Sequence, residues 1–352
     1  MQNIIKQTWI NNHYNMHCLQ LLVEVLHEFI FGRHRAPIIT SLMLVSLWLL
    51  FTIYSPQTFT HMRIYTSFMS AIPFTAMLAF CLTLLVITRE IDMSFPSVIA
   101  LGGYVFAATF QTTQSPPLAF IAAAIVGILC GILNGLLVVC FNIPSIIATI
   151  GSQFFIGGLT TVIADGLALS LPEVRDSWFH TMMVGRIADV IPAQAVWCLV
   201  ILAVLWLILS RHVFGDNINF IGDNPKAAEM MGVPVARTRL LLFVLMGLMS
   251  AVVGVFVSLE MSSWWPNQGQ GYMLLVFASV FIGGTSVLGG RGTLLGTFFG
   301  ACIIGILEAG IISAGLAGFW TRLVYGIIII ASLMIHSILL KQHKGAWKRL
   351  IH

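Results

Sequence analysis

Long apolar runs separated by short polar segments fill most of the chain. A membrane-spanning helix needs about 20 mostly apolar residues, and these runs allow about ten such helices. The expected spans are 37–54, 64–88, 93–110, 118–141, 145–164, 192–210, 240–259, 271–288, 293–312 and 320–340. Three of them fall in 93–164, which has no Asp, Glu, Lys or Arg and is broken by turn residues near 114–117 and 142–145. The pattern predicts an all-α, polytopic membrane helix bundle.

The composition agrees with a membrane protein. Of the 352 residues, 58% are hydrophobic and 9% are charged, whereas soluble domains are about one-quarter charged. The six cysteines show no CxxC or Cys/His spacing, so neither a metal site nor a cofactor is predicted. The motifs GxxxxGKS/T, HExxH and GxSxG are missing, so the chain is not expected to be an enzyme. Any ATP that it uses would be hydrolysed by another chain.

The basic residues predict the orientation, because cytoplasmic loops carry an excess of Lys and Arg. With an even number of spans and the N-terminus inside, 13 of the 17 Lys and Arg residues fall on the cytoplasmic side. The four on the outside are Arg63, Arg175, Arg186 and Arg322. Both termini and the polar segment 211–239 are therefore expected in the cytoplasm.

The polar segment 211–239 contains the signals of a short helix. Asn224 is a good N-cap, and Pro225 suits the first helical turn. Residues 226–231 can then form about two turns, which Gly232 can end. Because a helix this short is marginal in water, we expect it to dock on a partner. The alternative is an ordinary connecting loop.

Two carboxylates lie near or within apolar runs. Asp92 precedes Ser94 and Pro96, where it can either cap the third span or line a translocation path. Glu308 lies within the ninth span, where it can either carry a proton or sit near the outer surface.

Glycines recur every four residues in two spans, and this spacing places each series on one helix face for close packing. The series are Gly127, Gly131 and Gly135 in the fourth span, and Gly292, Gly296 and Gly300 in the ninth. Asn134 lies beside the first series and is expected to hydrogen-bond across helices. Farther along, Trp264 and Trp265 follow the seventh span, where paired Trp residues indicate either an aromatic belt at the membrane surface or a sugar-stacking surface.

Four motifs resemble those of the permease subunits of bacterial ABC importers for simple sugars, of the ribose, xylose, galactose and autoinducer-2 type. Residues 88–98 are similar to T-G-G-I-D-L-S-V-G-S-V, and 142–151 to I-P-S-F-I-A-T-L-G. Residues 281–296 look like G-G-T-S-L-x-G-G-x-G, and 222–232 match G-x-N-x-x-A-A-x-x-x-G. Here Arg89 and Glu90 stand where the first motif has two glycines, and Phe95 and Pro96 replace Val-Gly.

The resemblance implies a complex that works by alternating access. Two permease subunits, a homodimer or a heterodimer, would form the pathway across the bacterial inner membrane. Two cytoplasmic ABC ATPase subunits would bind the short helix at 224–232, and a periplasmic sugar-binding protein would dock on the other side and recognise the sugar. The alternative is a proton-coupled secondary transporter of a small polar solute, with Glu308 or Asp92 as the carrier.

We expect a transmembrane permease domain over 37–340, between a cytoplasmic or interfacial tail at 1–36 and a basic cytoplasmic tail at 341–352. The polar groups expected near the substrate path are Asp92, Ser94, Asn134 and Thr149. Those expected to couple to the ATPase are Asn224, Ala227, Ala228 and Gly232. Those expected to pack helices are Gly127, Gly131, Gly292 and Gly296.

Overall fold

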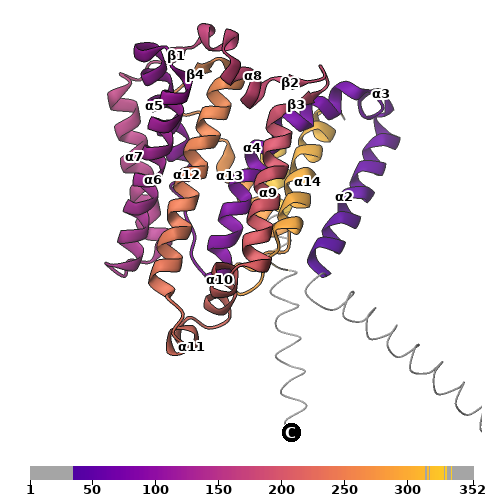
Figure 1. Ribbon diagram of the computed structural model, residues 1–352. Coiled ribbons are helices and arrows are strands. Elements are labelled where there is room, and N and C mark those ends of the chain that lie inside the picture. The colour runs from indigo at the N-terminus through magenta and orange to yellow at the C-terminus, as the bar shows by residue number, and fades with distance from the viewer. Residues whose placement is uncertain (1–34, 314, 317, 329, 331–333, 335–352) are drawn as a thin grey trace, which may run out of the picture.

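The computed structural model describes residues 35–313, 315–316, 318–328, 330 and 334, and within them the chain is mostly helical. The tails expected at 1–36 and 341–352 lie outside these residues almost entirely. The long helices stand side by side as a bundle (Figure 1). They are α2 (Arg35–Tyr54), α4 (Met62–Ile87), α5 (Phe95–Thr113), α6 (Pro116–Val139), α7 (Ser145–Ile163), α9 (Ala193–Arg211), α12 (Val235–Met261) and α14 (Leu294–Ser313).

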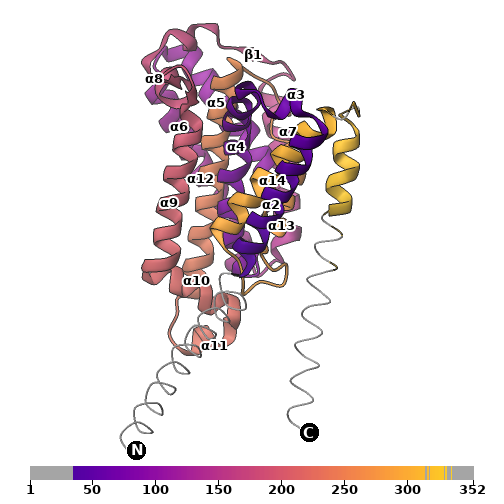
Figure 2. The same ribbon diagram turned by 90° about the vertical axis from the view of Figure 1, so that its right-hand side faces the viewer.

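Short elements join the long helices. Helix α3 (Pro56–Phe59) follows α2, and α13 (Tyr272–Ile282) precedes α14. One end of the bundle carries β1 (Leu169–Ser170), the 3-10 helix η1 (Pro172–Asp176), α8 (Trp178–Val184), β2 (Arg186–Ile187), β3 (Ile191–Pro192) and β4 (Ser263–Trp264). At this end β1 pairs with β4 and β2 with β3, both antiparallel. The opposite end carries α10 (Val213–Asp223) and α11 (Pro225–Met230), as both views show (Figures 1 and 2).

Seven of the described helices are long and apolar enough to cross a membrane, namely α2, α4, α6, α7, α9, α12 and α14. They coincide with seven of the expected spans. Helix α5 coincides with the third expected span but is not among the seven. It contacts α12, α6 and α7, so other helices rather than lipid surround much of it. The last expected span, 320–340, lies partly outside the described residues.

The eighth expected span, 271–288, was too long. Helix α13 has 11 residues and ends at Ile282. The backbone of Gly284 then takes a φ of +84°, which a helix cannot continue. Residues 283–293 form a loop, and this loop includes Gly292, which was expected on the ninth helix.

Helices of equal apolar character differ in burial. Within its most apolar window, α4 is 83% buried and α2 is 6% buried. Helix α4 contacts α9, α12, α13 and α14, so it forms the centre of the bundle. The exposed residues of α2 are those that a membrane would cover.

The glycines allow helices to approach closely. A Cβ at Gly131 would lie 2.5 Å from the carbonyl oxygen of Phe243 on α12, and one at Gly127 would lie 2.6 Å from that of Gly247. Helices α6 and α12 therefore touch backbone to backbone. In the second series, Gly296 lies against the carbonyl of Gly283, whereas Gly292 lies against Ile87 and Thr285.

The first residue of the tryptophan pair, Trp264, does not belong to an aromatic belt. Trp264 is fully buried, and its indole N–H donates to the carbonyl oxygen of Ala100 at 2.8 Å. Pairing of β4 with β1 carries this side chain inward, over α5. Trp264 is therefore neither at a lipid surface nor available to stack on a sugar.

Candidate coupling and translocation site

Helix α11 forms as the sequence predicts. The side-chain oxygen of Asn224 accepts hydrogen bonds from the backbone N–H groups of Lys226 and Ala227, at 3.1 and 3.2 Å. These bonds satisfy two donors that the first turn would otherwise leave unpaired. At the other end Gly232 takes a φ of +83°, and the N–H of Val233 donates to the carbonyl of Ala228 at 3.0 Å. The result is a short helix that is capped at both ends.

One face of α11 rests on its own chain. Ala228 is fully buried, and α11 contacts α10 and α12. Ala228 therefore seats the helix on the bundle. The surface left for a partner includes Met230 and Met231, which are 91% and 65% exposed. The motif did not single out these two methionines, although an apolar pair in a polar segment is a signal of a contact surface.

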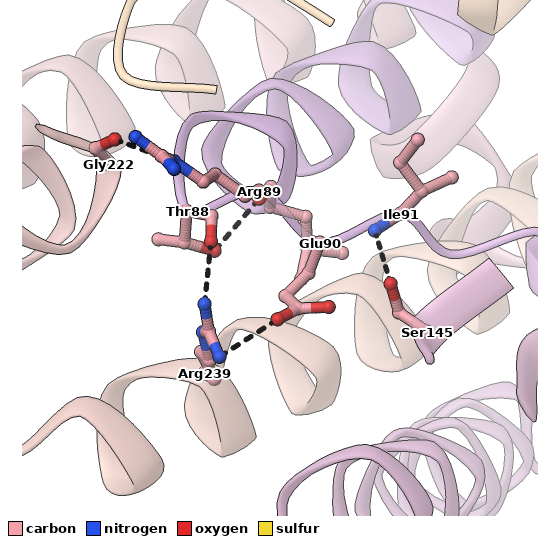
Figure 3. Close-up of polar contacts among 8 residues, drawn as sticks. Thr88, Arg89, Glu90, Ile91, Ser145, Gly222 and Arg239 are labelled. Carbon is pink, nitrogen blue, oxygen red and sulfur yellow. Dashed lines mark hydrogen bonds and ion pairs between the residues drawn. The ribbon is translucent and has the colours of Figure 1, made fainter. Parts of the chain in front are cut away.

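The loop between α4 and α5, residues 88–94, is the point where the motif segments meet (Figure 3). The Arg89 guanidinium donates to the carbonyl oxygens of Gly222 at 3.0 Å and Asp223 at 2.8 Å. Both acceptors lie at the C-terminal end of α10, where carbonyl groups lack helical partners. The cation also complements the partial negative charge at this helix end. Arg89 thus holds the residues that directly precede Asn224 and α11.

Glu90 binds the beginning of α12. Its carboxylate pairs with the guanidinium of Arg239 at 3.0 Å, and both side chains are mostly buried. A second nitrogen of Arg239 donates to the carbonyl oxygen of Thr88 at 3.1 Å. Figure 3 shows Arg239 between these two acceptors. The loop is therefore fixed to the chain both before and after α11.

The loop is also bound to α7, whose first residues carry the I-P-S-like motif. The N–H of Ile91 donates to the hydroxyl of Ser145 at 3.2 Å, and the N–H of Met93 donates to that of Thr149 at 3.0 Å. On α7, the Thr149 hydroxyl donates in turn to the carbonyl of Ser145 at 2.7 Å.

The glycine-rich loop after α13 completes the junction. The N–H of Gly290 donates to the carbonyl oxygen of Ile87, the last residue of α4, at 2.9 Å. A Cβ at Gly222 would lie 2.6 Å from this carbonyl oxygen and 2.9 Å from the Cα of Gly290. Three backbones therefore meet here with no room for side chains. All four motif segments contact one another through the α4–α5 loop.

A buried polar network continues from the loop into the bundle. One carboxylate oxygen of Asp92 accepts from the N–H and from the hydroxyl of Ser94, each at 2.7 Å. The side-chain amide of Asn134 on α6 donates to the Ser94 hydroxyl at 2.7 Å. This is the cross-helix hydrogen bond expected of Asn134. The amide oxygen of Asn134 is buried and has no partner in the described part of the chain.

The structure brings together the four residues expected near a substrate path, but it buries them. Asp92, Ser94, Asn134 and Thr149 are at most 1% exposed. Two surface grooves of the described residues are apolar, and neither includes any of the four. In this single chain the residues surround the start of α5. Glu308 is far along α14 and exposed. No group of three or more His, Cys, Asp or Glu residues in the described ranges could hold a metal ion.

The fold itself is that of a polytopic membrane protein. It is a multi-pass membrane bundle with a short capped helix projecting from one end (Figure 2). Residues 64–333 match the family described as branched-chain amino acid transport system, permease component. The chain belongs to this family of ABC importer permeases, which are components of transport systems. It is accordingly a multi-pass protein of the bacterial inner membrane.

Three relatives are similar over most of their length. A ribose import permease protein of Bacillus subtilis is 32% identical over 74% of this chain and 80% of its own. A fructose import permease protein of Rhizobium meliloti is 30% identical over 72% of each chain. The permease protein of an autoinducer 2 import system of an Enterobacter species is 31% identical over 77% of this chain and 79% of its own.

Proposed function

We propose that this chain is the permease subunit of an ATP-driven ABC importer for a monosaccharide or a related polyol. The observation that carries the proposal is the junction at the α4–α5 loop. There the projecting helix α11 is connected by side-chain contacts to a buried polar network at the start of α5. The import of ribose, fructose and autoinducer 2 by the relatives supports a small polyhydroxylated substrate.

In this proposal α11 docks on a cytoplasmic ABC ATPase. Its exposed methionines, Met230 and Met231, support an apolar contact, and Lys226 and Glu229 beside them are also exposed. Asn224, Ala227, Ala228 and Gly232 give the helix its ends and its seat. ATP closes the ATPase dimer, α11 moves with it, and two permease subunits rock about a shared pathway. A periplasmic sugar-binding protein delivers the substrate at the opposite end.

The orientation follows from the same proposal. About ten spans would place both termini in the cytoplasm, on the side of α11. Lys226 lies on α11, and Arg211, Arg237 and Arg239 flank it, whereas Arg175 and Arg186 belong to the opposite end, with η1 and β2. This distribution supports a cytoplasmic α11. The transmembrane permease domain would then cover 37–340, with cytoplasmic tails on both sides.

Asp92, Ser94, Asn134 and Thr149 are proposed as the polar groups near the path. Burying four polar side chains in an apolar bundle, away from water, costs free energy that hydrogen bonds must offset. Such groups within membrane bundles are commonly retained for function. In the proposed complex the pathway lies between two permease subunits. The rocking motion of these subunits would expose the network to the pathway. Helix packing by Gly127, Gly131 and Gly296 would keep the surrounding helices rigid.

The test is an affinity pull-down of the detergent-solubilised chain from its native membrane, followed by mass spectrometry. The wild-type chain should bring down an ABC ATPase. The variant Ala228→Arg should lose it, because the Arg side chain cannot fit at a fully buried position and would unseat α11. The matched control is Glu173→Arg, which introduces the same side chain at an exposed position of the opposite end and should retain the ATPase. A chain that comes down alone, even after mild crosslinking, would favour the proton-coupled transporter.

A further inference from the structure

The α4–α5 loop departs from the motif that it resembles at Arg89 and Glu90, whose side chains bind the segments on either side of α11. Arg89 and Glu90 stand where the similar motif T-G-G-I-D has two glycines. The backbone of Arg89 has a φ of +68°, a conformation that glycine adopts readily and that other residues rarely take. Glycine would therefore suit the backbone better. What Arg89 adds is its side chain.

The Arg89 side chain reaches the residues just before α11. Its aliphatic part lies against Gly289, where any Cβ would collide with it. Its guanidinium then donates to the carbonyl oxygens of Gly222 and Asp223. Two hydrogen bonds from one planar cation fix both the position and the direction of the end of α10.

Glu90 reaches the residues just after α11. Its ion pair with Arg239 lies in the second turn of α12, which begins at Val235. Arg239 also holds the Thr88 carbonyl, so the contact has two points on the loop. Arg89 therefore binds the segment that precedes α11, and Glu90 binds the segment that follows it.

The same loop leads directly to the buried network. Ile91 and Met93 are bound through their N–H groups to α7. Asp92 between them accepts from Ser94, which occupies the N-cap position of α5 and accepts from Asn134. A shift of α11 must therefore move the loop, break its contacts with α7, or break the contacts of Arg89 and Glu90.

We propose that Arg89 and Glu90 form a two-point clasp, made of Arg89, Glu90, Arg239 and the carbonyls of Gly222 and Asp223, that transmits the movement of α11 to the start of α5. The clasp sets how much ATP is hydrolysed for each substrate imported. Both side chains are positioning residues, since they act through α11 and Asp92. The inference rests on the proposed function and deepens it.

The test uses the complete complex in proteoliposomes, made from this chain, the ATPase captured with it and its binding protein. ATP hydrolysis and substrate uptake are measured together, so that the readout is ATP hydrolysed per substrate imported. Arg89→Gly removes the guanidinium but suits the backbone, whereas Arg89→Ala removes it and keeps the unfavourable φ. The clasp predicts that both variants retain the ATPase and that both raise the ratio by about tenfold, as expected for the loss of charge-assisted hydrogen bonds.

A double-mutant cycle tests the second point of the clasp. Glu90→Gln and Arg239→Gln should each raise the ratio, and the double variant should be no worse than the stronger single variant. Arg237→Gln is the matched control, since Arg237 is exposed near the start of the same helix and should leave the ratio unchanged.

Three results would overturn the clasp. One is a wild-type ratio in Arg89→Gly with a raised ratio only in Arg89→Ala, which would make backbone conformation the cause. Another is loss of the ATPase from these variants, which would make the residues part of its seat. The third is additive effects of Glu90→Gln and Arg239→Gln. In each case wild-type uptake with ATP would leave the proposed function standing, whereas failure of the wild-type chain to bind an ATPase would overturn both.

Discussion

Two carboxylates lie two residues apart in the α4–α5 loop and have very different surroundings. Glu90 pairs with Arg239 at 3.0 Å near the end of the bundle, and part of each side chain reaches the surface. Asp92 is 1% exposed and is held by a hydroxyl and a backbone N–H. Within the described ranges, the one ion pair between acidic and basic side chains is that of Glu90 with Arg239.

This difference separates a contact that joins segments from a group that the protein keeps at a cost. A mostly buried ion pair must offset the desolvation of both charges, so its net contribution to stability is small. The free-energy cost of enclosing a carboxylate without a countercharge must be offset by hydrogen bonds. Such groups within membrane bundles commonly mark functional sites. In the proposed function Glu90 serves coupling and Asp92 lies near the path, and substitutions at four positions test this distinction.

The largest effect is expected for Asp92→Leu. The substitution leaves the N–H and hydroxyl of Ser94 without their acceptor and should lower the free energy of unfolding by about 3 kcal/mol. Asp92→Asn keeps an acceptor oxygen and should cost much less stability, while still abolishing uptake. Thermal unfolding in detergent and uptake in proteoliposomes measure the two effects. Unchanged uptake in Asp92→Asn would remove Asp92 from the path.

Ser94→Ala should come next. Its hydroxyl donates to Asp92 and accepts from Asn134. Its loss leaves the Asn134 amide without its acceptor and leaves the Asp92 oxygen with the Ser94 N–H alone, at about 1–2 kcal/mol in total. Thermal unfolding should show this loss. Ser97→Ala is the matched control, since the Ser97 hydroxyl, which is not fully buried, makes a single bond to the carbonyl of Gln153. Equal losses for the two variants would mean that the network has no special role.

Thr149→Val is expected to have a smaller effect. It preserves the shape of the side chain and removes the acceptor for the Met93 N–H, at about 1 kcal/mol. The loop should become more mobile, so amide hydrogen exchange at Met93 and Ser94 should increase while exchange in α12 stays as it is. Unchanged protection of Met93 would contradict the anchoring of the loop on α7.

The smallest effect on stability is expected for Glu90→Gln, below about 1 kcal/mol, because the Gln side-chain oxygen can still accept from Arg239. Its effect on the ATP used per substrate should nevertheless be large. Because ions screen a mostly buried pair only weakly, raising the salt concentration should leave the difference between the wild type and Glu90→Gln largely intact. A loss of stability in Glu90→Gln as large as in Asp92→Leu would contradict the distinction between the two carboxylates.

The parts of the fold and site that depend on local chemistry were predictable from the sequence. Asn224, Pro225 and Gly232 define the ends of α11 through signals within a few residues of one another. Seven expected spans coincide with helices for the same reason, since length and apolar character are local properties. Helix α13 was predicted too long because apolar residues beyond Ile282 outweighed the turn signal of Gly283 and Gly284.

Features that depend on distant partners were not predictable. Nothing near Glu90 in the chain indicates Arg239, and nothing near Arg89 indicates the carbonyls of Gly222 and Asp223. Trp264 was placed at a membrane surface because its pairing with a distant strand, which turns it inward, leaves no trace in its own segment. Periodicity likewise could not distinguish the buried α4 from the exposed α2, since both are equally apolar.

If the chain belongs to an ATP-driven importer, ATP and not the proton gradient should drive uptake, and this can be measured directly. Cells that express the chain with its neighbouring importer components would be offered labelled ribose, fructose and related polyols, while ATP and the proton gradient are varied independently. Uptake of at least one of these substrates should continue when the proton gradient is collapsed and stop when ATP is depleted. Uptake that stops with the proton gradient while ATP remains high would contradict it, and Glu308 and Asp92 would then be examined as proton carriers.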